Sequence, residues 1–102
     1  MANTFKNYTS SGVGSVDTTV YTVPASTTSV VTGINVANVV EEQILVDIQI
    51  GGVYLIKNAP LPVGSSLSPL DGKIIIETTD TIVVKSDQAA SADVLISVLE
   101  QT

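Results

Sequence analysis

The side chains available for acid–base chemistry are ten carboxylates, four lysines and three tyrosines, because this chain of 102 residues has no His and no Cys. Carboxylate pairs hydrolyse glycosides when burial or a neighbouring charge tunes their pKa values. The acids here stand mostly where expected strands meet turns, or at outward strand positions: Asp47, Asp71, Glu77, Asp80, Asp87 and Asp93. Acids at such positions usually form turn hydrogen bonds or a solvated face. The sequence therefore predicts a protein that is not an enzyme, with a carboxylate hydrolase as the least favoured alternative.

The same carboxylates are candidate ligands for calcium, and Asp80, Asp87 and Asp93 are candidates to approach one another at one end of the fold. The segment 87–93, DQAASAD, does not have the alternating ligands and central glycine of a calcium loop. The Gly-rich segment 10–15, SSGVGS, lacks the preceding strand, lysine and following helix of a phosphate-binding loop, so we interpret it as a hinge. We predict no metal and no cofactor.

Charge and hydropathy exclude two classes of partner. The net charge is −6, and the four lysines are scattered singly, so there is no basic stripe for nucleic acid: Lys6, Lys57, Lys73 and Lys85. No apolar run approaches the roughly 20 residues that span a bilayer, and residues 1–15 have no signal-peptide core. Only 14% of the residues are charged, against about 25% in typical soluble domains. We expect a protein partner or self-association to cover this weakly charged surface.

The elements that must position these groups are strands. In residues 43–50 Ile and Val alternate with Gln, Leu and Asp, which is the pattern of a half-buried strand. Gly51-Gly52 follows and suits the positive φ angles of a two-residue hairpin turn, so residues 53–57 form the returning strand.

Further strands are expected at 18–23, 27–38, 73–77, 81–86 and 93–99, with Val30, Ile34 and Val36 on one face of the second and Gly33 marking a bulge. Residues 58–68 contain prolines and form an irregular connection, and no helix is required. These seven strands, with an eighth if the N-terminus contributes one, predict an all-β fold: a single antiparallel, jelly-roll-like β-sandwich.

Residues 1–15 are polar and rich in Ser and Gly, and we predict an extended N-terminal arm there, followed by a sandwich domain at 16–102. Phe5 and Tyr8 are the large anchors of the arm and our first candidates for protein contact. Leu45, Tyr54 and Leu55 are weaker candidates, because outward apolar residues either face a second layer or mark an intersubunit surface.

Four segments together resemble small, strand-rich structural proteins of tailed bacteriophages, cyanophages especially. They are VYTVPA at 20–25, the strand at 30–38 that ends in VAN, PLPVGSSL at 60–67 and DTIVVKS at 80–86. The likeness extends from about residue 17 to residue 100.

The resemblance implies a protein of the virion, made in the host cytoplasm and placed most readily on the capsid surface. There it would be a decoration or cement protein that contacts the major capsid protein or another virion protein as a homo-oligomer, with a trimer favoured. Components of the neck, tail, baseplate or head fibre are the first alternative. A carbohydrate or host-surface binding module is the second, although the absence of Trp leaves only three tyrosines for stacking on sugars.

Overall fold

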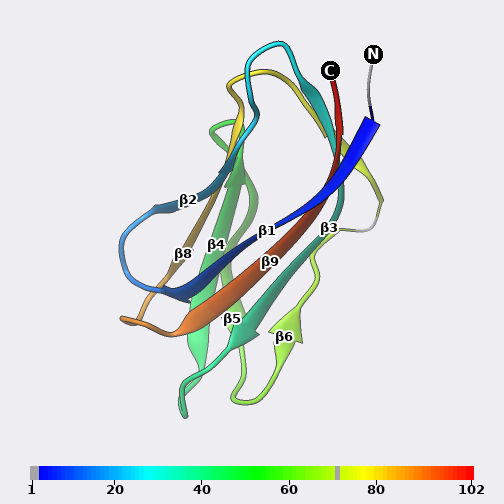
Figure 1. Ribbon diagram of the computed structural model, residues 1–102. Helices are drawn as coiled ribbons and strands as arrows, with labels where there is room; N and C mark the ends of the chain where they lie inside the picture. The colour runs from blue at the N-terminus through cyan, green and yellow to red at the C-terminus, as the bar shows by residue number, and fades with distance from the viewer. Residues whose placement is uncertain (1–2, 71) are drawn as a thin grey trace.

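The computed structural model describes residues 3–70 and 72–102, and these residues form nine strands and no helix. The strands form two antiparallel sheets that pack as a β-sandwich, elongated to 45 × 21 × 20 Å (Figure 1). This confirms the predicted all-β sandwich, with nine strands in place of seven or eight. Within the described ranges there is no helix long and apolar enough to cross a membrane.

The first sheet, which we call the front sheet, has the order β1-β9-β3-β6, and β7 also pairs with β3. Its strands are β1 (Asn3–Val13), β3 (Thr28–Asn38), β6 (Ser66–Leu67), β7 (Ile74–Ile76) and β9 (Ala92–Gln101). In Figure 1 β1, β9 and β3 lie side by side, and Asn3 at the start of β1 pairs with Gln101 at the end of β9. The centre of this sheet is β9, which is paired along its length on both sides.

The second sheet, the back sheet, has the order β2-β8-β4-β5. Its strands are β2 (Thr18–Thr22), β4 (Ile44–Ile50), β5 (Val53–Leu61) and β8 (Thr81–Ser86). The β4–β5 hairpin confirms the most specific local prediction, because Gly51 and Gly52 have φ angles of 60° and 80°. Positive φ at both positions defines the turn that matches strand twist.

The core lies between the inward faces of the two sheets and is built almost entirely from Val and Ile. Its fully buried members include Val31, Val36, Ile44, Val46, Ile48, Ile82, Val84, Ile96 and Val98. Branched side chains of this kind pack well on pleated surfaces and favour strands over helices. The alternation along β4, β8 and β9 therefore fixes which face of each strand is buried.

The bulge predicted at Gly33 is present, because the pairing of β3 with β9 shifts register between Val31 and Gly33. The shift moves the alternation by one residue, so Val31 points inward and Val30 outward. The prediction that Val30 shares a face with Ile34 and Val36 was wrong for this reason.

The predicted N-terminal arm was also wrong over its described part, because residues 3–13 pair with β9 as strand β1. The predicted hinge at 10–15 is a bulged end of that strand, where Ser91 donates to the carbonyl of Val13 and Ser86 to that of Gly14. A Cβ on Gly14 would meet Ala89 at 3.3 Å, so this glycine permits close backbone approach.

The connection predicted at 58–68 is partly strand. The edge strand β5 continues to Leu61, and Ser66–Leu67 pairs with β3 as β6. Pro60 is tolerated inside β5 because an edge strand has one side with no ladder to complete.

Candidate functional site

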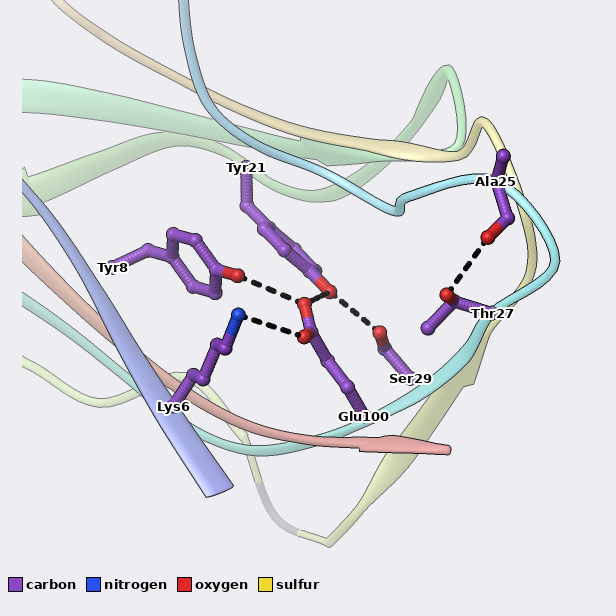
Figure 2. A network of polar contacts seen from close by, with 7 residues as sticks. All are labelled: Lys6, Tyr8, Tyr21, Ala25, Thr27, Ser29 and Glu100. Atoms are coloured by element: carbon purple, nitrogen blue, oxygen red, sulfur yellow. Dashed lines mark hydrogen bonds and ion pairs between the residues drawn. The ribbon is translucent and has the colours of Figure 1, made fainter. Parts of the chain in front are cut away.

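A buried carboxylate lies between the two sheets near the end of β9. The Glu100 side chain points inward from β9 and only 5% of the residue is exposed, although the rest of the buried face of β9 is apolar (Figure 2). In the pairing of strands, Thr4 of β1 and Ser29 of β3 lie opposite it. A charge in such a position requires partners, since an unpaired buried carboxylate is costly.

Four side chains from three other strands surround Glu100. The hydroxyls of Tyr8 and Tyr21 donate to its Oε2 at 2.8 and 2.6 Å, and Lys6 Nζ lies 3.5 Å from its Oε1. The Tyr21 hydroxyl also shares a hydrogen bond of 2.5 Å with Ser29 Oγ. The two phenol rings pack with centroids 4.4 Å apart. We call these five residues the Glu100 network.

The electrostatics of this network keep Glu100 ionised and both tyrosines neutral. Burial by itself would raise the pKa of Glu100, but the hydrogen bonds from Tyr21 and Tyr8 and the charge of Lys6 outweigh it, and the pKa is lowered. Burial, followed by the hydrogen bond to Glu100, raises the pKa of Tyr8 and of Tyr21. Each group is held in its ordinary neutral-pH state, which is the arrangement of a structural contact.

The Glu100 network therefore joins β1, β2, β3 and β9, and it was not predicted from the sequence. Tyr8, a predicted contact residue, points inward here and is packed against the core, so that role does not fit its position. The signal available was the spacing of Lys6 and Tyr8, which places both on one face of a strand. Their polarity concealed the alternation that would have identified β1.

Several of the other acids accept backbone hydrogen bonds, as the sequence indicated. Asp47 accepts from the N–H of Asn58 at 2.6 Å, Asp87 from that of Leu45 at 3.0 Å and Asp93 from that of Gly12 at 3.0 Å. Asp80 accepts from Glu77 within its own turn. In residues 3–70 and 72–102 no three acidic side chains gather as a metal site would require; Asp71 lies outside the described residues.

The outward surface of the front sheet, which we call the front face, carries an apolar row in register across four strands. Phe5 lies opposite Leu99, Leu99 opposite Val30, and Val30 opposite Ile75. Phe5 is 80% exposed and Ile75 68%, at the two ends of the row. Residues directly opposite one another on neighbouring strands have Cβ atoms about 4.5–5.5 Å apart, so the row is a continuous strip. A continuous apolar strip at the surface is a candidate for protein contact.

Beside this row the front face is hollowed and mostly polar, with Asp93 in the lining of the first hollow and Lys6 in that of the third. Three adjoining hollows of about 470, 270 and 160 Å³ lie over β1, β9 and β3. Leu95 and Asn35 border the first two, and Thr32 and Ser97 border the second and third. Hydroxyl and amide groups around an apolar strip suit a wet protein interface better than a catalytic cleft.

The remaining predicted contact residues lie elsewhere. Leu45 and Tyr54 are 37% and 46% exposed on the outward surface of the back sheet, which we call the back face. Leu55 is partly buried and packs against the core. Of the predicted set, Phe5 alone belongs to the front face, so the sequence pointed to residues that the fold places on different sides of the sandwich.

No protein-family model matches this sequence, and the curated proteins likewise contain no match. Among solved structures, the chain is similar to one described as "Bacillus endospore appendages form a novel family of disulfide-linked pili". The TM-score is 0.57 at 14% identity, and the alignment covers 99% of this chain and 87% of the other. The likeness extends over the whole sandwich and shows a shared fold.

Proposed function

We propose that this chain is a non-enzymatic structural protein of a tailed-phage virion, acting as a capsid decoration protein that stabilises the shell by protein–protein contact. The observation that supports a contact role best is the front face, with its apolar row from Phe5 to Ile75 beside mostly polar hollows. The resemblance in the sequence suggests the virion, with the major capsid protein as the partner and a trimer as the assembled form.

The disposition of the polar groups favours this proposal over an enzyme. The buried carboxylate of Glu100 is fully engaged by two hydroxyls and an ammonium group, and it faces the core. Asp47 accepts a backbone hydrogen bond at the irregularity in the pairing of β4 with β5, and Asp87 and Asp93 accept backbone hydrogen bonds near strand ends. A general acid or base must reach a substrate, and acids committed in this way are poorly suited to do so.

The positions of the three tyrosines favour a structural protein over a carbohydrate-binding module. Sugar sites stack rings on exposed aromatic faces. Tyr8 and Tyr21 are turned inward to Glu100, and Lys57 Nζ lies 4.6 Å from the ring centre of Tyr54.

A subunit of a filamentous appendage is a second candidate, favoured by the structural likeness to the Bacillus chain over nearly the full length. That protein is described as forming disulfide-linked pili, whereas this chain has no Cys. A filament of this chain would therefore rest on non-covalent contacts.

Quantitative mass spectrometry of purified phage particles, with immunogold labelling by antibodies to this protein, tests the proposal. A copy number close to that of the major capsid protein, with label over the head, is the expected result. A far smaller number with label at the neck or tail would support the alternative location. Absence from particles, or label along filaments, would reject the virion role.

A further inference from the structure

The front face has a projection and a recess of matching kind at different positions along the same strands. The projection is Phe5, the most exposed large apolar residue of the described chain. The recess is the hollow of about 470 Å³ bordered by Thr9 and Leu95. The hollow can accommodate a phenyl ring, and its lining mixes apolar and hydroxyl groups with the amide of Asn35 and the carboxylate of Asp93.

The spacing of the two features suits a two-fold axis. Phe5 and Thr9 stand four residues apart on β1, which corresponds to about 13 Å along an extended strand. Midway lies Asn7, with Ser97 opposite it on β9. A two-fold axis in the plane of contact, perpendicular to the strands and passing beside Ser97, would place each copy's Phe5 over the other copy's hollow.

The residues at that central position permit close approach. Ser97 pairs with Gly33 on β3, where an added Cβ would meet nothing within 4 Å. Ser97 Oγ already donates to Asn7 Oδ1 at 2.9 Å, so it brings no unsatisfied donor into the contact. Small side chains at the axis, with larger ones on either side, make the face complementary to itself.

Charge permits this contact although each copy has a net charge of −6. Among the outward positions of β1, β9 and β3, Asp93 is the charged residue, and it stands four residues from Ser97. The two-fold would hold the two Asp93 side chains about 27 Å apart along the strands, well beyond the screening length of about 8–10 Å.

The area is sufficient for a stable pair. The front sheet is ten residues long at β9 and four strands wide. At ordinary strand rise and spacing, this length and width give about 600 Å² per copy, or about 1,200 Å² in total. Specific interfaces begin at about that size.

We propose that two copies of this chain associate face to face through their front faces, about a two-fold axis at Ser97, with Phe5 of each copy seated in the hollow beside Leu95 of the other. This inference names a second copy of the chain as the occupant of the front face and a dimer as the assembled form, in place of the trimer that the resemblance implies, so the oligomeric state decides between the two.

Sedimentation velocity of the full chain over a range of concentrations tests the association. The unmodified protein should form a dimer. Phe5→Ser should weaken it at least tenfold, and Ser97→Glu, which brings two like charges together at the axis, should weaken it more. Tyr54→Ser, an exposed aromatic on the back face, should leave it unchanged. Thermal melting confirms that each variant folds.

Cross-linking tests the axis independently, because the chain has no Cys and a single introduced thiol is unique. Ser97→Cys should give a covalent dimer with a bis-maleimide spanning about 10 Å, the separation of packed sheets. Gln49→Cys on the back face should remain monomeric under the same conditions. A monomer at all concentrations, a trimer, or a dimer that cross-links through Gln49→Cys and survives Phe5→Ser would overturn the proposal.

Discussion

The two outward surfaces of this sandwich differ in how they treat charge. On the back face Asp47 of β4 stands opposite Lys85 of β8, and Lys57 lies over the ring of Tyr54. On the front face the outward positions of β1, β9 and β3 hold Phe5, Leu99 and other uncharged residues, with Asp93 as the exception. Charged side chains keep a surface solvated, and their depletion with retained aromatics is the composition of interface cores. The difference supports the proposal that the front face makes the contact and the back face stays solvated.

The inward surfaces of the two sheets differ in the opposite way, because here the front sheet carries the charged groups. Beneath the back face, β4 and β8 are anchored by apolar residues such as Ile48 and Val84. Beneath the front face, β1 is anchored at Lys6 and Tyr8 through ionised Glu100. The strand that presents Phe5 is therefore held by directional polar contacts, and its position is set by the Glu100 network as well as by pairing with β9.

The largest predicted effect comes from breaking this polar anchor. Glu100→Gln removes the charge that two hydroxyls and Lys6 share, and should lower the free energy of unfolding by about 2–3 kcal/mol. Urea unfolding followed by tyrosine fluorescence measures it. Glu77→Gln, at an exposed position, should change stability by less than about 0.5 kcal/mol; equal effects would show that the network contributes nothing.

The same anchor predicts a pH dependence. Because the folded-state pKa of Glu100 lies below its ordinary value of 4.5, its contribution is fully present above that value and is lost as the pH falls through the folded pKa. The stability difference between the unmodified protein and Glu100→Gln should shrink from pH 7 to pH 3 in parallel urea titrations. A difference that stays constant would show that ionised Glu100 is not the source.

The comparison of the two outward faces predicts a smaller effect, in which a charge introduced on the front face weakens binding and one on the back face does not. Leu95→Glu on the front face should weaken association or partner binding about tenfold or more, equivalent to about 1.4 kcal/mol, because it buries a second carboxylate in the hollow that Asp93 already lines. Val83→Glu on the back face is the matched control and should leave binding unchanged. Sedimentation and binding to purified particles both measure this, and an equal loss for both variants would remove the distinction between the faces.

The smallest effect is expected on the back face itself. Tyr54→Ser loses the contact with Lys57, which at an exposed site is about 0.5–1 kcal/mol. Thermal melting should show that modest loss. A loss as large as that of Glu100→Gln would mean that the back face contributes more to the fold than its exposure suggests.

The fold was largely predictable because Val and Ile alternate with other residues along β4 and β8. Gly51-Gly52 marks the turn that follows β4 and so predicts the returning strand β5. Strand β1 was missed since its inward residues are polar, and alternation detects strands only where one face is apolar. The apolar row of the front face could not be predicted from the sequence, for a different reason. Phe5, Leu99 and Ile75 come from segments far apart in the chain, and only the register of β1, β9, β3 and β7 aligns them.

Hydroxyl-radical footprinting of the protein in its assembled state, compared with the dispersed chain, tests the assignment of contact to the front face most directly. Phe5, Leu95, Leu99 and Ile75 should become protected, while Leu45 and Tyr54 keep the reactivity that they have in the dispersed chain. Protection of Leu45 and Tyr54 with Phe5 and Ile75 still reactive would contradict the assignment and place the contact on the back face.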